Sequence, residues 1–104
     1  MNVPEKIQTE VNLRQYLSYL IDVLGWGFHP DDPIEDYVNE DGTHIFDELQ
    51  VVVLEKLMEE SFYICEQKGL DIYETSMVIC TEMYGNIFEE LNKSYSEKNG
   101  KKTN

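Results

Sequence analysis

A chain of 104 residues, 41% of them hydrophobic, is long enough for one folded domain and too apolar to be wholly disordered. Its formal net charge of −13 disfavours direct nucleic acid binding, because contacts to phosphates depend on clustered Lys and Arg. No apolar run reaches the roughly 18 residues that a membrane-spanning helix requires. The first residues also lack the basic start and apolar core of a signal peptide. We therefore expect a cytoplasmic protein without membrane contact.

The first expected helix ends at Leu24, with Gly25 as a suitable terminator. It begins either near Pro4, since proline suits the first helical position, or at Thr9, which is a good capping residue. Its apolar stripe has helical spacing and comprises Leu13, Tyr16, Leu17, Leu20, Val23 and Leu24.

Two large aromatic residues, Trp26 and Phe28, follow among glycines. One interpretation is that they fold back and cover one end of a helical bundle. The other is that they form an exposed anchor for a partner, because aromatic side chains dominate interface hot spots. The sequence is compatible with both.

Residues 29–46 contain no long helical pattern. Asp32 and Glu35 fit a capping box around Pro33, which predicts a short helix over residues 33–38. Residues 39–42 are typical of a turn in which Gly42 takes a positive φ, and a small β-hairpin around that turn is a further prediction.

Two long helices joined by a tight turn at residues 68–71 are the centre of the predicted fold. Capping boxes beginning at Asp47 and Asp71 mark their starts, and Gly69 can end the first of them in a left-handed conformation. The expected core stripe of the first is Leu49, Val51, Leu54, Leu57, Met58, Phe62 and Cys65. The facing stripe is Tyr73, Met77, Cys80, Tyr84, Ile87, Leu91 and Tyr95.

The two cysteines lie on these stripes. In an antiparallel pair of helices turning at Gly69, Cys65 and Cys80 are offset by roughly 9 Å at about 1.5 Å per residue, which is too far for a disulfide. We predict two reduced thiols. Ser61 and Ser76 lie near the same stripes, where small side chains permit close approach of helices.

These elements predict an all-α fold: a small three-helix bundle with a structured loop and a short helix between the first two long helices. We expect residues 1–92 to form a single helical domain. Residues 93–104 carry four of the eight basic residues against one acid and show no apolar period, so we expect a disordered, basic, polar tail.

Acidic residues are concentrated in one part of the chain. Between Arg14 and Lys56 there is no Lys or Arg, while ten Asp and Glu residues occur. Such a stretch is either a solvated face that confers solubility or a surface that docks a basic partner. The candidate partner-binding residues are Trp26, Phe28, Asp31, Asp32, Glu35, Asp36, Glu40 and Asp41. This pattern favours a non-enzymatic protein–protein interaction module, such as an adaptor, an inhibitor or an immunity-like protein.

The sequence contains no phosphate-binding glycine loop, nucleophile elbow or Cys-x-x-Cys motif, so we expect no catalytic residues and no cofactor. The alternative function is a small calcium-type regulatory protein. With Gly42 at position 6 of an EF-hand loop, Asn39, Asp41 and Glu48 fall at ligand positions. Tyr37 then occupies position 1, where the loop needs a carboxylate.

The last helix is apolar nearly all round over residues 77–80, which suggests that a second side is buried. Gly85 also suggests a buried second side. Glycine in a helix interior costs roughly 1 kcal/mol relative to alanine, and close approach of another backbone would explain its presence. The first helix and the aromatic loop can cover this side. The alternative is a homodimer through Val78, Ile79, Met83 and Gly85.

Overall fold

The computed structural model describes residues 2–85, except for the side chain of Trp26. Over this range the chain is all-α, with three α-helices and no β-strand, as predicted. The α-helices are α1 (Glu10–Leu24), α2 (Glu48–Lys68) and a third helix described over residues 72–85. Two short 3-10 turns, η1 (Gly25–Gly27) and η2 (Ile34–Asp36), lie between α1 and α2. None of the helices in this part of the chain is long and apolar enough to cross a membrane.

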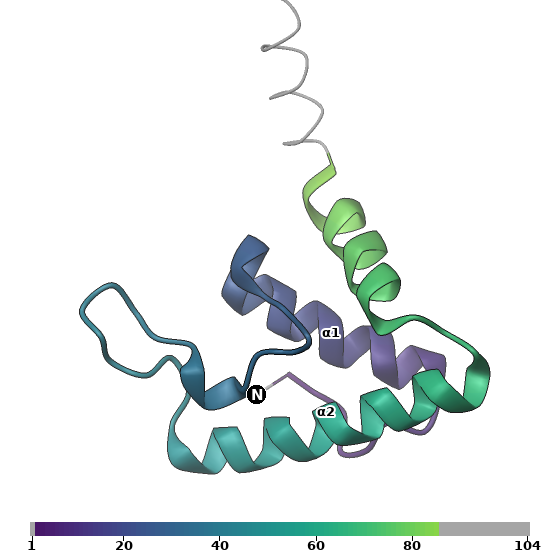
Figure 1. The fold of residues 1–104 in the computed structure, drawn as a ribbon, viewed down its shortest axis with the longest axis horizontal. Coiled ribbons are helices and arrows are strands. Elements are labelled where there is room, and N and C mark those ends of the chain that lie inside the picture. The colour runs from purple at the N-terminus through teal and green to yellow at the C-terminus, as the bar shows by residue number, and fades with distance from the viewer. Residues whose placement is uncertain (1, 86–104) are drawn as a thin grey trace, which may run out of the picture.

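α1 and α2 lie side by side and run in opposite directions, and the third helix rises away from α2 and passes beside α1 (Figure 1). Hydrogen bonds join it to α1. The Arg14 guanidinium donates to the Glu82 carboxylate at 2.5 Å, and the Tyr84 hydroxyl donates to the Ile21 carbonyl at 3.2 Å. The expected antiparallel pairing of the last two helices is therefore wrong, because the third helix packs on α1 and does not run back along α2.

The helix boundaries follow local capping chemistry. Thr9 caps α1, its hydroxyl accepting from the Asn12 amide at 3.1 Å, so the later of the two predicted starts is the correct one. Asp47 and Gln50 form the predicted reciprocal capping box at the start of α2, with bonds of 2.8 and 2.9 Å. These local signals confirm two of the predicted helix starts.

The turn after α2 also forms as predicted. Gly69 takes a left-handed conformation with φ of 66°, and the Leu70 amide donates to the Cys65 carbonyl at 2.8 Å, which is the bond that closes a helix C-terminus. Asp71 then caps the third helix by accepting from the Tyr73 amide at 2.8 Å. The turn thus ends one helix and starts the next within a few residues.

The short helix predicted over residues 33–38 is reduced to the three-residue turn η2, and the capping box at Asp32 is wrong. The residue preceding η2 is Pro33, which has no side-chain capping bond. The Ile34 amide instead donates to the Glu55 carboxylate of α2 at 2.8 Å. A tertiary partner has therefore replaced the local cap.

The predicted turn at residues 39–42 is present, with Gly42 at φ of 86°. Val38 and His44 form an isolated antiparallel bridge across it, and the Asn39 amide donates to the Thr43 carbonyl at 2.7 Å. The small hairpin around this turn is confirmed as a single bridged pair.

The core lies between α1, α2 and the third helix, and its stripes differ from those predicted. Five residues expected inside are exposed: Val23, Leu49, Phe62, Tyr73 and Met77. Their places are taken by Ser61, Ile64, Ile72, Ser76 and Ile79, all of which are buried. Moving a stripe by one residue rotates the buried face by about 100°. The third helix makes this rotation because its neighbour is α1.

Both cysteines are buried and unbonded to each other, as predicted. Burial raises the pKa of both thiols, and the nearby charge of Asp71 adds to the effect at Cys65. Three residues of the predicted stripe (Ile87, Leu91 and Tyr95), the tail at 93–104 and the domain end at residue 92 lie outside the described residues.

Candidate functional site

The candidate site is the acidic segment, by which we mean residues 29–46 between η1 and α2. Its hairpin extends beyond the helices near the start of α2 (Figure 1). All six predicted partner-binding carboxylates of the segment are exposed: Asp31, Asp32, Glu35, Asp36, Glu40 and Asp41. The structure thus presents all six on one connecting segment, which runs from Asp31 beside Tyr73 to Glu40 and Asp41 in the hairpin.

This segment is anchored to the helices at several points. Ile34 and Phe46 are buried in the core, at 1% and 4% exposure. The Tyr37 hydroxyl accepts from the His29 amide at 2.9 Å and donates to the His29 carbonyl at 3.0 Å. Partial burial raises the pKa of Tyr37, so the phenol stays a neutral donor at neutral pH. The carboxylates are consequently presented from a fixed backbone.

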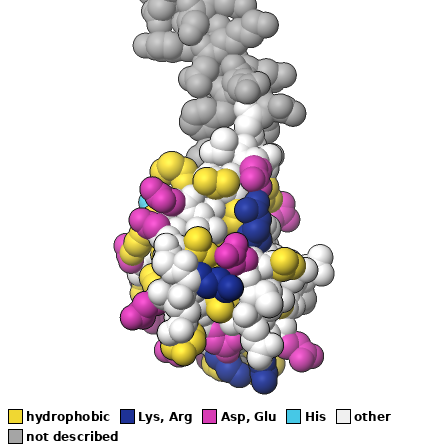
Figure 2. Space-filling model, turned by 90° about the vertical axis from the view of Figure 1, so that its right-hand side faces the viewer, with side chains coloured by type: hydrophobic (Ala, Val, Ile, Leu, Met, Phe, Trp, Pro, Cys, Tyr) yellow, Lys and Arg dark blue, Asp and Glu magenta, His cyan; other side chains and the backbone are white. Residues whose placement is uncertain are grey.

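None of the six carboxylates forms an ion pair with a Lys, Arg or His within residues 2–85, where Arg14 pairs with Glu82. The opposite end of the molecule looks different. Figure 2 views that end and shows Lys and Arg side chains among acidic and hydrophobic ones. Among the residues that the structure describes, no Lys or Arg side chain therefore neutralises the acidic segment by direct pairing.

The tip of the segment has its own hydrogen-bond network. The Asp41 carboxylate accepts from the Thr43 hydroxyl at 2.6 Å and from the Thr43 amide at 3.0 Å. The side-chain bond is the main cause of a lowered Asp41 pKa. The Asn39 amide group donates to the same hydroxyl at 3.0 Å. These bonds close a turn of the kind that Asp residues commonly form.

The metal-binding alternative gains no support from this geometry. Asp41 and Asn39 are engaged with Thr43, and Glu48 lies in the first turn of α2. In the part of the chain that the structure describes, no group of three or more His, Cys, Asp or Glu side chains could hold a metal ion.

Of the two aromatic candidates, Phe28 is a core residue, 8% exposed, which agrees with the interpretation that it covers one end of the bundle. The side chain of Trp26 is not among those described. Phe28 is therefore not an exposed anchor for a partner.

The candidate self-association residues are divided by the structure. Val78 and Met83 are exposed, whereas Ile79 is 2% exposed and belongs to the core against α1. A Cβ atom on Gly85 would meet nothing within 4 Å among the described residues. The close backbone neighbour expected there is thus absent from the described part of the chain, and self-association through Val78 and Met83 stays a prediction.

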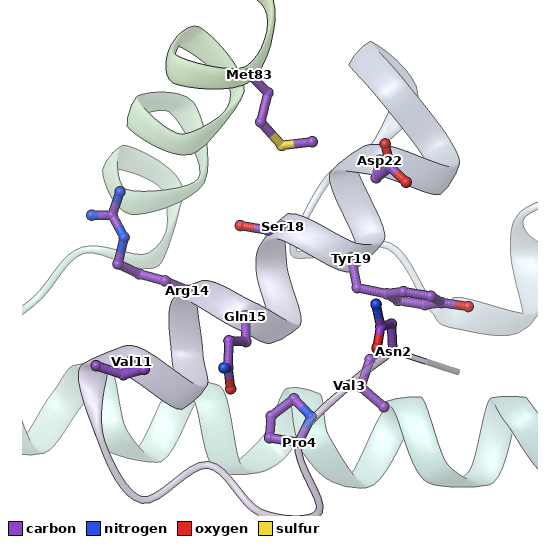
Figure 3. Close-up of a pocket in the computed structure, with 10 residues that line it drawn as sticks. All are labelled: Asn2, Val3, Pro4, Val11, Arg14, Gln15, Ser18, Tyr19, Asp22 and Met83. Atoms are coloured by element: carbon purple, nitrogen blue, oxygen red, sulfur yellow. The ribbon is translucent and has the colours of Figure 1, made fainter.

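An open groove of about 780 Å³ lies along α1. Figure 3 shows Met83 pointing from the third helix toward α1 and the Tyr19 ring lying over the N-terminal segment at Asn2 and Val3. Its lining mixes polar and apolar side chains and includes no residue of the acidic segment. We assign it no role.

A smaller pocket of about 240 Å³ adjoins the acidic segment, and sequence reasoning did not find it. Its lining is mainly apolar and comes from α1, η1 and the residues after it, and the third helix: Ile21, Gly25, Phe28, His29, Pro30, Tyr73, Ser76, Met77 and Cys80. At its edge the Tyr73 hydroxyl donates to the Asp31 carboxylate, a bond that raises the Tyr73 pKa. The sequence signal that could have indicated this pocket was Tyr73 and Met77, two large side chains that the predicted stripe placed in the core and the structure leaves exposed.

Comparison of the chain with known protein families, with curated proteins and with solved structures gives no significant match.

Proposed function

We propose that the protein is a non-enzymatic, cytoplasmic interaction module that docks a basic surface of a partner protein, as an adaptor, an inhibitor or an immunity-like protein does. One observation carries the proposal: six exposed carboxylates on one anchored segment have no cation paired with them among the described residues.

Charge supports this function physically. Like charges held close together repel one another, and a basic partner surface relieves that repulsion while it accelerates encounter between the two proteins. A net charge of −13 extends the attraction over the whole molecule. Nucleic acid is an unsuitable partner for the same reason.

The anchoring of the segment supports the function as well. Binding costs free energy whenever a loop has to be ordered in the complex. Here Ile34, Phe46 and the Tyr37 hydrogen bonds already hold the backbone, so little ordering remains to be done.

The test compares two variants with the same change in net charge. One neutralises the acidic segment by Asp32→Asn, Glu35→Gln, Asp36→Asn and Glu40→Gln. The control neutralises four exposed acids elsewhere by Glu5→Gln, Glu59→Gln, Glu66→Gln and Glu74→Gln. Each protein is used to capture binders from native cell extract at low salt (about 50 mM) and at about 0.5 M, where the Debye length falls below about 5 Å.

We expect the wild type and the control to capture the same basic protein at low salt, and the acidic-segment variant to lose it. High salt should weaken capture by all three. Equal loss in both variants would show that only overall charge matters, and no capture by the wild type at low salt would remove the proposal.

A further inference from the structure

We infer that the basic partner inserts one apolar side chain, aliphatic or aromatic, into the pocket between α1 and the third helix, while its flanking Lys or Arg residues meet the acidic segment. This inference rests on the proposed function and adds to it a specific anchor site. It is carried by the apolar pocket and by the carboxylates at its edge.

The floor of the pocket is part of the folded core. Ile21, Phe28 and Cys80 are 1%, 8% and 7% exposed, and all three line it. The volume of about 240 Å³ lies below the range of about 300–1,000 Å³ that is usual for small-molecule sites. A pocket of this size and lining suits one inserted side chain better than a cofactor.

The edge of the pocket offers apolar surface that a partner can cover. Met77 is 69% exposed and Tyr73 is 47% exposed, although both carry large apolar groups. Methionine adapts its shape to different contacts, and tyrosine is frequent at binding hot spots. Tyr73 is also held in place by its hydrogen bond to Asp31.

Charge decides what kind of molecule carries the anchor. His29 lines the pocket, and the chain continues from it through Pro30 to the exposed carboxylates of Asp31 and Asp32. No Lys or Arg lines this pocket among the described residues. The acidic edge attracts Lys and Arg beside the anchor and repels an anionic membrane surface. The occupant is therefore a basic segment of a protein.

The probe is a short lysine-rich peptide with one central leucine, compared with the same peptide carrying alanine at that position. Binding to the intact protein is measured by fluorescence anisotropy at low salt. We expect the leucine peptide to bind about tenfold more tightly, because its side chain buries apolar groups in the pocket that the alanine peptide lacks.

Two neighbouring exposed residues of the third helix provide a matched pair of variants. Met77 lines the pocket, whereas Val78, 50% exposed, does not. Met77→Ser should reduce the advantage of leucine over alanine severalfold, and Val78→Ser should leave it unchanged. Circular dichroism checks that both variants fold.

Methyl NMR locates the anchor. The leucine peptide should shift the methyl signals of Ile21 and Met77, and the alanine peptide should not. Leucine-dependent shifts at Leu49 and Val52, exposed on α2, would overturn the inference by placing the anchor elsewhere.

The outcomes separate this inference from the proposed function. If both peptides bind equally and neutralising the acidic segment abolishes binding, charge docking stands and the anchor pocket is wrong. If neither peptide binds the wild type at low salt, the proposed function fails and the anchor pocket fails with it.

Discussion

Tyr16 illustrates how one residue links sequence pattern to packing. It lies on the predicted stripe of α1 and is fully buried, and its hydroxyl donates to the Leu54 carbonyl of α2 at 2.6 Å. Burial raises its pKa strongly, and the charge of Glu55 adds to the effect. The phenol is thus a neutral donor that joins α1 to α2.

The first prediction concerns this bond. Tyr16→Phe removes the donor while keeping the ring, so the free energy of unfolding should fall by about 1 kcal/mol. Urea denaturation followed by circular dichroism measures the change. Tyr63→Phe is the control, because Tyr63 is 63% exposed and its loss should change little. Identical midpoints for wild type and Tyr16→Phe would show that the bond contributes nothing.

The second prediction concerns pH at Asp41, whose pKa is lowered by the Thr43 hydroxyl. A lowered pKa in the folded state stabilises the turn above the unfolded pKa of about 3.9. That contribution is lost as the pH falls through the folded value. Thr43→Val removes the hydroxyl, so carboxyl NMR titration should show the Asp41 pKa rising toward its ordinary value.

Thr75→Val is the matched control for this titration. The Thr75 hydroxyl donates to the Asp71 carbonyl and does not touch Asp41, so the Asp41 pKa should stay low in this variant. An unchanged Asp41 pKa in Thr43→Val would contradict the assigned cause.

At the scale of elements, the turn after α2 determines where the third helix goes. Gly69 ends α2 in a left-handed conformation, and Asp71 starts the third helix two residues later. The third helix then packs on α1 through the contacts of Arg14 and Tyr84. A short turn therefore starts the third helix, while those tertiary contacts fix its direction.

The third prediction compares a glycine in this turn, Gly69, with one in the third helix, Gly85. Gly69→Ala forces a side chain into the left-handed region and should destabilise the protein by about 1 kcal/mol. Gly85 is helical and has open space around it among the described residues, so Gly85→Ala should stabilise by up to about 1 kcal/mol. Thermal unfolding measures both.

Gly85→Ala also tests self-association. If a second copy packs closely on Gly85, the substitution should weaken a dimer detected by analytical ultracentrifugation and should not stabilise the protein. Val78 and Met83 remain exposed for such contact, and a wild type that sediments as a monomer would contradict it.

At the scale of the whole molecule, charge opposes folding. With a formal net charge of −13, folding brings many carboxylates together, and their repulsion weakens as salt screens it. The fourth prediction is that Tm rises with NaCl over about 0.02–0.5 M. A Tm independent of salt would show that the carboxylates are too far apart to matter.

The same measurement addresses the metal alternative. CaCl2 at equal ionic strength should raise Tm about as much as NaCl does. A larger, saturable rise at submillimolar calcium, lost in Asp41→Asn, would instead support a site involving Asn39, Asp41 and Glu48.

The sequence by itself determined the features that depend on near neighbours in the chain. The caps at Asp47 and Asp71 and the turn at Gly69 could be predicted because each is closed by atoms within a few residues, and the Thr9 cap was one of two predicted starts of the first helix. The acidic segment was also evident, since charge density is a property of composition.

Only the tertiary structure decided which faces are buried and where the pocket lies. Apolar residues on several sides of the third helix allowed two stripes, and packing on α1 selected the one with Ile72 and Ile79 and left Tyr73 and Met77 exposed. Likewise Glu55 of α2 replaced the local cap of η2. Helical period limits which residues can share a face, but the position of the neighbouring helix determines which face is buried.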